Sequence, residues 1–134
     1  MRIAAAVLAA VVVLAGCGFD VQSADLFQVT RTGQGQKLTL LVNDSGTVAC
    51  NGGKPKSLPD RLLLQARDLA TTLNDDAKAK RRFRAGTGSV FSYTVKVQNG
   101  TFTFPDTAAV ARKELSQLEL FVIQAAADPC GISA

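Results

Sequence analysis

The chain has 134 residues, 47% hydrophobic and 19% charged, with a formal net charge of +4. That length fits a single domain, and a charge this modest does not by itself indicate binding to nucleic acid. The chain has no histidine, which excludes Ser-His-Asp and Cys-His catalysis, histidine proton shuttles and histidine-ligated zinc. We therefore expect a protein that is not an enzyme, that holds no metal and that binds no nucleic acid.

The chain begins with an apolar run, Ile3–Leu14, preceded by Arg2, the only charge ahead of Asp20. A charged start, a short apolar core and small residues at its end are the parts of a secretory signal peptide. A membrane-spanning helix needs about 20 apolar residues, and this run is shorter. The pattern predicts that residues 1–16 form a signal peptide.

The apolar run ends in Leu14-Ala15-Gly16-Cys17, which resembles the lipobox of bacterial lipoproteins. The resemblance implies that Cys17 receives a diacylglyceryl group and acyl chains such as palmitate, and becomes the N-terminus after cleavage. Two or three acyl chains hold a protein firmly at a membrane, whereas one binds marginally. It further implies a lipid-anchored protein on the extracytoplasmic face of the cell membrane. Residues 17–25 would form a short tether. We expect the protein to have no cofactor besides the lipid on Cys17. The alternative is a plain signal peptide.

Three strand candidates open the mature chain. Leu26–Thr32 is followed by Lys37–Val42, which is apolar enough to be buried on both faces, and by Thr47–Cys50. Glycines and small polar residues separate them and indicate turns at 33–36 and 43–46. This arrangement predicts a three-stranded antiparallel meander.

The next segment has the signals of a helix start. Ser57 can cap the helix, Pro59 suits its first turn, and Asp60 meets the positive end of the helix dipole. Apolar residues then recur at spacings of three and four, at Leu62, Ala66, Leu69, Leu73 and Ala77. We predict a helix from about Leu58 to about Ala79.

A hairpin follows, because apolar and polar residues alternate from Val90 to Gln98, ahead of Asn99-Gly100. Asn-Gly is the preferred two-residue hairpin turn, since both of its positions need positive φ. A turn there pairs Val97 with Phe102 and Val95 with Phe104. The apolar face then matches across the two strands.

A second helix of about 20 residues is predicted after the hairpin, capped by Asp106 or Thr107 and stopped by Asp128-Pro129. Leu120 points away from the main apolar face and Ile123 lies well off it. Either a neighbouring loop covers these two side chains or they form an exposed patch for a partner; we favour the loop. The main face comprises Ala111, Leu115, Leu118, Val122 and Ala125.

Two cysteines, Cys50 and Cys130, remain once Cys17 is assigned to lipid. An even pair in an oxidising compartment predicts a disulfide, and the alternative is two free buried thiols. The bond would close a loop of about 80 residues, worth roughly 4–5 kcal/mol in the chain-entropy model.

The order of elements is three strands, a helix, two strands and a helix. We therefore predict that residues 26–134 form one two-layer α+β domain. It would have an antiparallel sheet of about five strands, both helices on one face of it, and one disulfide.

One conspicuous charge cluster follows the first predicted helix. The ordinary interpretation is a solvated helix end, where cations complement the helix dipole. The functional hypothesis is contact with an anionic surface, to which each cation contributes about 1 kcal/mol. Asp75 and Asp76, beside the cluster, are expected to be a solvated surface pair. The cluster comprises Lys78, Lys80, Arg81, Arg82 and Arg84.

From Leu26 onward the chain resembles small secreted lipoproteins of high-GC Gram-positive bacteria whose role is uncharacterised. The stretches that carry the resemblance are Lys37–Val42, Cys50–Gly53 and Cys130-Gly131. It implies no activity, and we expect a non-catalytic binding or interaction module of the cell envelope. Its partners would be the membrane, an envelope protein or an anionic cell-wall polymer. The alternative is an inhibitor of an extracellular hydrolase. The strand and helix content is similar to that of subtilisin inhibitors, although the chain offers one disulfide where that family uses two.

Overall fold

The computed structural model describes residues 24–133. The predicted signal peptide and Cys17 lie outside these residues. Within them the chain forms six strands, two α-helices and one 3-10 helix. In chain order they are β1 (Asp25–Gly33), β2 (Gln36–Asn43), β3 (Thr47–Cys50), β4 (Lys56–Ser57), α1 (Asp60–Lys78), β5 (Ser92–Val97), β6 (Gly100–Pro105), η1 (Asp106–Val110) and α2 (Lys113–Ala127).

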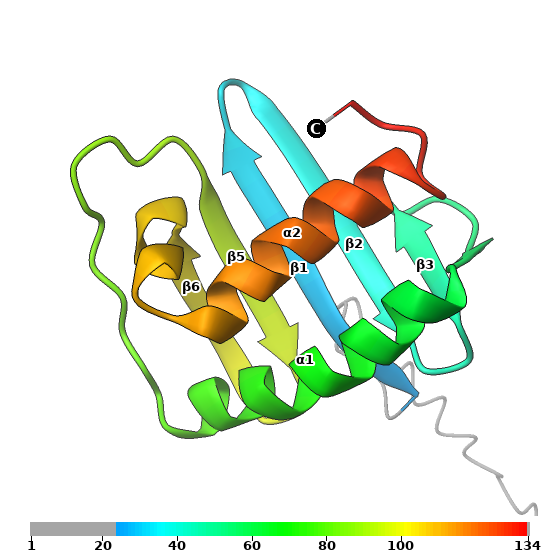
Figure 1. The fold of residues 1–134 in the computed structure, drawn as a ribbon, viewed down its shortest axis with the longest axis horizontal. Coiled ribbons are helices and arrows are strands. Elements are labelled where there is room, and N and C mark those ends of the chain that lie inside the picture. The colour runs from blue at the N-terminus through cyan, green and yellow to red at the C-terminus, as the bar shows by residue number, and fades with distance from the viewer. Residues whose placement is uncertain (1–23, 134) are drawn as a thin grey trace, which may run out of the picture.

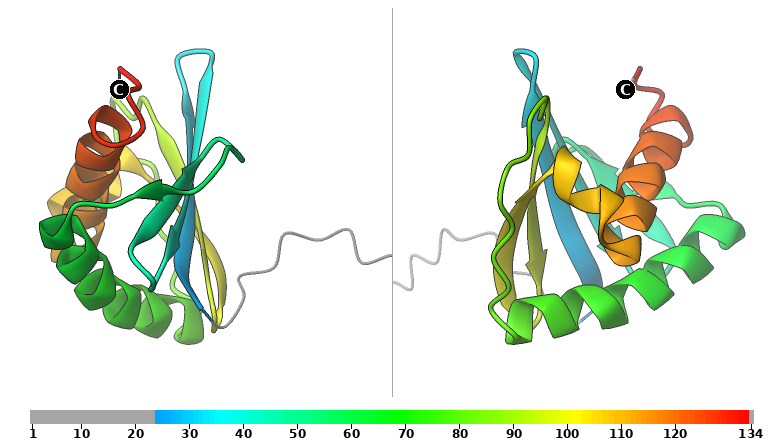
Figure 2. Two further views of the ribbon diagram at one scale, coloured as in Figure 1. Left: turned by 90° about the vertical axis from the view of Figure 1, so that its right-hand side faces the viewer. Right: turned by 60° about the vertical axis from the view of Figure 1, so that its left-hand side comes forward.

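The six strands form one antiparallel sheet in the order β4-β3-β2-β1-β5-β6. Both helices lie over the same face of this sheet (Figures 1 and 2). The predicted two-layer α+β class is therefore confirmed. The difference in strand number comes from β4, a two-residue strand between β3 and α1 where no strand is predicted.

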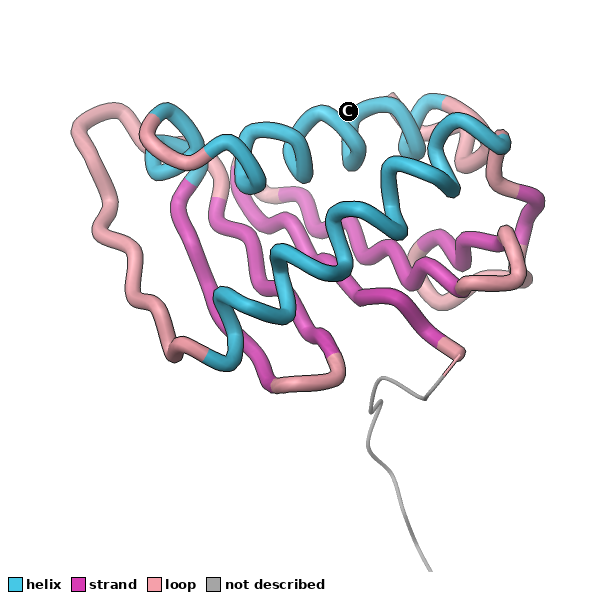
Figure 3. The backbone as a smooth tube through the Cα atoms, turned by 60° about the horizontal axis from the view of Figure 1, so that its bottom comes forward, coloured by secondary structure: helices cyan, strands magenta, loops and turns pink. Residues whose placement is uncertain are grey.

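The hydrophobic core lies between the sheet and the two helices. Figure 3 shows that both helices run across the strands on one side of the sheet. Alternate residues of β1, β2, β5 and β6 are buried in this core, as the period of two requires. Phe27 of β1 meets Phe121 of α2 edge to face, with ring centroids 5.5 Å apart. Such aromatic pairs add to the energy of burial and fix α2 over β1.

Neither α1 nor α2 covers the opposite face of the sheet (Figure 2). Most of its side chains are polar, with Leu41 of β2 and its cross-strand partner Ala49 as apolar exceptions. Four threonines stand in one row across it, because Thr39, Thr30, Thr94 and Thr103 are successive cross-strand partners. The hydroxyl oxygens of Thr30 and Thr39 lie 3.2 Å apart, and those of Thr94 and Thr103 lie 3.3 Å apart. Cross-strand threonine pairs of this kind stabilise a sheet.

The predicted cap of the first helix is wrong. Ser57 pairs with Thr47 in the sheet, and α1 begins at Asp60 with no side-chain hydrogen bond at its cap. The reason is tertiary, since Leu58 is buried and its amide donates a hydrogen bond to the carbonyl oxygen of Gly46 (2.8 Å). Those contacts hold the chain extended up to Pro59.

The predicted second helix is also corrected. Instead of one helix of about 20 residues, the chain forms η1, an extended residue at Arg112 (φ −134°, ψ 111°) and then α2. Both candidate caps have other hydrogen bonds: Asp106 accepts from the amides of Val90 and Phe91, and Thr107 accepts from the amide of Gly86. As a result Ala111 is exposed rather than part of the buried face.

The hairpin between β5 and β6 forms, but the predicted register is wrong by two residues. Val97 pairs with Gly100, and Val95 pairs with Phe102. A shift of two keeps every side chain on its expected face. The turn therefore lies at residues 98–99, where the side-chain oxygen of Asn74 in α1 accepts a hydrogen bond from the amide of Asn99 (3.0 Å).

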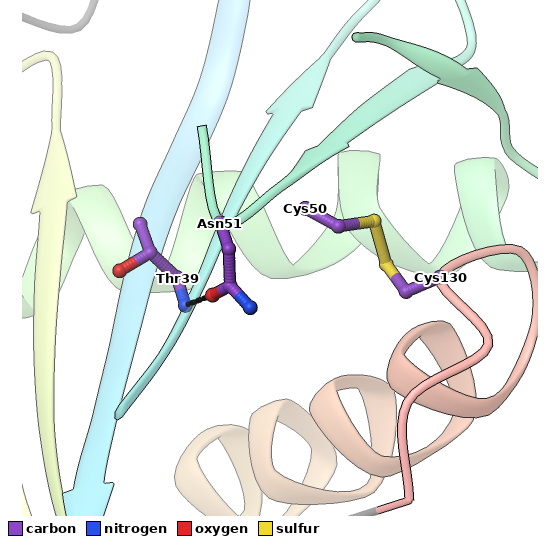
Figure 4. The surroundings of a disulfide bond; sticks show 4 residues. All are labelled: Thr39, Cys50, Asn51 and Cys130. Atoms are coloured by element: carbon purple, nitrogen blue, oxygen red, sulfur yellow. Dashed lines mark hydrogen bonds between the residues drawn. A yellow bond between two sulfur atoms is a disulfide. The ribbon is translucent and has the colours of Figure 1, made fainter. Parts of the chain in front are cut away.

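The disulfide between Cys50 and Cys130 is confirmed, with the two Cα atoms 5.9 Å apart. It joins the end of β3 to the segment that follows α2 (Figure 4). Beside it, the amide of Thr39 donates a hydrogen bond to the side-chain oxygen of Asn51 (2.8 Å). This end of the sheet is thus held both covalently and by the backbone.

Candidate functional site

The candidate site is built on the C-terminal end of α1. Lys80 has a φ of 52°, its amide donates to the carbonyl oxygen of Ala77, and the amide of Arg81 donates to the carbonyl oxygen of Asp76. This pair of hydrogen bonds is a Schellman motif, in which a helix ends at a residue with a left-handed backbone conformation. The motif turns the chain back and places Arg81 directly against Asp76.

Asp76 is the centre of an ionic cluster at this position. Its side chain is only 3% exposed, and its Oδ1 atom lies 2.9 Å from Nε of Arg81 and 3.0 Å from Nη2 of Arg112. Arg112 also pairs with Glu114 at 2.8 Å. The Oδ2 atom of Asp76 has no hydrogen-bond partner among residues 24–133. The expected solvated pair is therefore wrong for Asp76, while Asp75 is exposed.

Above this cluster lies an open groove of about 600 Å³ between the segment after α1 and the turn that precedes α2. Figure 2 shows the segment running past β6 and beside η1. Four guanidinium groups, an aromatic ring, two small apolar side chains and one hydroxyl line the groove. They belong to Arg81, Arg82, Arg84, Arg112, Phe83, Ala108, Ala111 and Thr107.

Phe83 anchors the arginine segment to the sheet. Its ring packs against those of Phe102 and Phe104, with centroids 6.0 Å and 6.2 Å away. The guanidinium carbon of Arg112 lies 5.9 Å from the centre of the same ring, within the range of a cation–π contact. One side chain therefore fixes the segment and supports a cation from the other side of the groove.

The loop beyond Arg84 is held by the start of η1. The carboxylate of Asp106 accepts hydrogen bonds from the hydroxyl of Ser89 (2.8 Å) and from the amides of Val90 (3.0 Å) and Phe91 (3.1 Å). Burial alone would raise the pKa of Asp106, but these hydrogen bonds hold it below its ordinary value. A Cβ added at Gly86 would lie 3.2 Å from Thr107, so the two sides of the loop meet closely there.

The charges of the groove are not balanced. Burial, together with the nearby Glu114 carboxylate, raises the pKa of Asp76 to about 6, against the lowering effect of Arg112 and Arg81. Burial would also raise the pKa of Glu114, but hydrogen bonds from its own amide and from Arg112 lower it. Four guanidinium groups thus face two carboxylates, and Arg82 and Arg84 form no salt bridge within residues 24–133.

The structure separates the predicted cationic cluster into two parts. Arg81, Arg82 and Arg84 line the groove, whereas Lys78 and Lys80 are exposed at the end of α1 and do not line it. Sequence analysis missed the residues on the other side of the groove, Arg112 and Glu114, and the buried position of Asp76. The spacing of Asp76 and Arg81 across a helix end was the available signal. Nothing local links them to Arg112.

A separate apolar surface lies on α2. Leu120 is 50% exposed and Ile123 is 48% exposed, so no loop among the described residues covers them and the favoured covering loop is wrong. Ile123 also lines a shallow depression of about 430 Å³ with Ala127, Gly131 and Ile132. This surface is distinct from the arginine groove.

Comparison with known protein families, curated proteins and solved structures gives no match to this chain. In residues 24–133, neither helix has the length and apolar character needed to span a bilayer. The same residues contain no group of three or more possible metal ligands.

Proposed function

We propose that the protein is a non-catalytic binding module of the bacterial cell envelope that binds an anionic surface through its arginine groove. A lipid on Cys17 would anchor it to the extracytoplasmic face of the membrane, which the lipobox-like Leu14–Cys17 supports. The tether from Gly18 to Asp25 spans at most about 28 Å when extended. The groove would therefore stay near the membrane and the cell-wall polymers around it.

The observation that carries this proposal is the unpaired charge of Arg82 and Arg84. Both are exposed, both line one groove with Arg81 and Arg112, and neither forms a salt bridge among the described residues. Like charges gathered in one groove repel each other unless an anion compensates them. The planar guanidinium group matches phosphate and carboxylate oxygens in pairs, which makes arginine the side chain suited to such ligands.

The test uses the full chain carrying Cys17→Ser, so that no lipid contributes to binding. Binding is measured to vesicles of phosphatidylglycerol and to neutral vesicles of phosphatidylcholine. The apolar N-terminal run contributes to both. Arg82→Glu/Arg84→Glu should weaken binding to the anionic vesicles by at least roughly 30-fold, since each cation near an anionic membrane contributes about 1 kcal/mol.

The matched control is Lys54→Glu/Lys56→Glu, which changes the net charge equally at exposed positions on the opposite end of the sheet. If both variants lose the same affinity for the anionic vesicles, binding depends on the net charge of the protein and not on the groove. Unchanged binding in the arginine variant would refute the proposal.

A second candidate, binding to an envelope protein, is favoured by the exposed Leu120 and Ile123 of α2. A pull-down from envelope extract tests it, since an apolar contact survives high salt whereas an ionic one is lost. Leu120→Ser/Ile123→Ser should release the captured protein, and capture that this variant leaves intact contradicts the candidate. Assays against secreted serine proteases test the inhibitor hypothesis.

A further inference from the structure

Behind the groove, and not among its lining residues, lies a carboxylate that pairs with two of the groove's arginines and so competes with any anion for them. Asp76 has 2% relative exposure, and its Oδ1 atom holds both Nε of Arg81 (2.9 Å) and Nη2 of Arg112 (3.0 Å). These two guanidinium groups are half of the four that line the groove. An ionised Asp76 therefore neutralises part of the positive charge that an anionic ligand would meet.

The groups that face Asp76 can be named from each side. Arg81 comes from the segment after α1, and Arg112 and Glu114 come from the start of α2. β6, which also packs against α1, has no ionisable side chain. β1 and β5 pack against α1 as well, and none of their ionisable residues is among the causes that set the pKa of Asp76. Those residues are Asp25, Arg31, Tyr93 and Lys96. A proton on Asp76 would leave one carboxylate against four guanidinium groups and so raise the positive potential of the groove.

We infer that the arginine groove binds phosphodiester groups together with a proton, which the Asp76 carboxylate takes up from solvent as the anion enters. The inference rests on the proposed anion binding and adds its ligand class and its regulation. A phosphodiester has several acceptor oxygens for neighbouring guanidinium groups. It also keeps its single negative charge over the whole pH range in which proteins are stable. The carboxylates that pair with the groove's arginines, Asp76 and Glu114, are then the groups that respond to pH.

Asp76 can take up a proton near pH 6, because burial and the nearby Glu114 raise its pKa to about 6. A bound anion disfavours the ionised carboxylate further, so the pKa of Asp76 rises again on binding. By linkage, a rise of one in that pKa makes affinity at about pH 5 roughly tenfold greater than at about pH 8.

The experiment measures binding of the full chain carrying Cys17→Ser to a soluble poly(glycerol phosphate) chain at about pH 5 and about pH 8, where linkage predicts the roughly tenfold difference. Asp76→Asn keeps the shape of the side chain and removes the charge, as protonation does. It should bind at both pH values with the affinity that the unmodified residue gives at the lower pH. Asp75→Asn is the matched control, because it changes the same charge at the exposed neighbouring position. It should keep the full pH dependence.

Calorimetry in two buffers of different ionisation enthalpy provides a readout that needs no variant of Asp76. It should show net proton uptake when the polymer binds near neutral pH. Affinity that is independent of pH, or a pH dependence that Asp76→Asn retains, overturns the inference and leaves anion binding in place. If Arg82→Glu/Arg84→Glu binds the polymer as tightly as the unmodified groove does, the inference and the proposed function both fail.

The two sources of phosphodiester are separated by parallel measurements. Phosphatidylglycerol vesicles present the group on a lipid, the poly(glycerol phosphate) chain presents it on a polymer, and phosphatidylcholine vesicles control for apolar contact. The same pH dependence with either anionic probe supports the inference and identifies the source by the higher affinity. Binding to phosphatidylcholine gives the contribution of the apolar N-terminal run, and the absence of pH-dependent binding beyond it with both anionic probes contradicts the inference.

Discussion

Asp106 should act as the principal hydrogen-bond acceptor that holds the loop beside the arginine groove. Its carboxylate accepts from one hydroxyl and two backbone amides, at 2.8, 3.0 and 3.1 Å, across 15 to 17 residues of sequence. Asp106→Ala removes all three hydrogen bonds at once. The amides of Val90 and Phe91 would then have to find water or remain without a partner.

The expected cost can be worked from these contacts. A hydrogen bond to a charged group contributes about 1.5–3 kcal/mol, with more lost if a buried donor is left unpaired. Val90 is 47% exposed, so water can replace part of what the carboxylate supplied. We therefore expect Asp106→Ala to lower the free energy of unfolding by about 2–3 kcal/mol in total. That corresponds to a fall in Tm of about 8–12 °C for a domain of this size.

The assay is urea denaturation at neutral pH, with Asp106→Asn and Asp128→Ala measured in parallel. Asp106→Asn keeps one acceptor oxygen and loses the charge, so about half of the cost is expected. Asp128→Ala removes an exposed carboxylate and should change stability by less than about 0.5 kcal/mol. If Asp106→Ala is no more destabilising than Asp128→Ala, the loop is not held as the hydrogen bonds indicate.

Three further predictions concern stability. Cys50→Ser/Cys130→Ser opens a sequence separation of 80 residues and should cost about 4–5 kcal/mol in chemical denaturation; reduction of the unmodified protein should give a similar loss. Burial, with the charge of Asp106, raises the pKa of Glu119 from 4.5 to about 7. The folded state thus binds that proton more tightly, and stability is lost as pH rises from about 4.5 through about 7. Glu119→Gln should flatten that slope in a denaturation series over pH, and an unchanged slope contradicts the assignment. Lys80→Gly should raise the unfolding free energy by about 0.5–1 kcal/mol because Lys80 is left-handed, whereas Lys78→Gly, inside α1, should lower it.

The parts of the fold that were predicted correctly depend on local patterns. The spacing of Leu62, Leu69 and Leu73 places α1, because a helix brings residues three and four apart to one face. Alternation places β5 and β6, and the two cysteines that remain once Cys17 is assigned to lipid predict the disulfide. Each of these signals lies within one element or one composition rule.

The parts that were wrong depend on contacts between distant residues. The hairpin register differs because Asn74, 25 residues away, bonds the amide of Asn99. The second helix breaks at Arg112, whose guanidinium reaches Asp76 across 36 residues. The same contact explains why only one side of the groove could be predicted from the sequence. No local pattern indicates that Arg112 faces Arg81.

The disulfide and the arginine groove lie at opposite ends of the sheet, the first beside β3 and the second beside β6. One end is closed by a covalent bond, whereas the other is closed by hydrogen bonds, ion pairs and the packing of Phe83. Partial openings of a folded domain start where the fewest strong contacts must break. Amide exchange should therefore be faster along the segment beside β6 than in β3 beside the disulfide. A ligand bound in the groove should therefore slow amide exchange most in the segment beside β6. The two ends of the domain thus differ in local stability, and the ligand would bind at the less stable end.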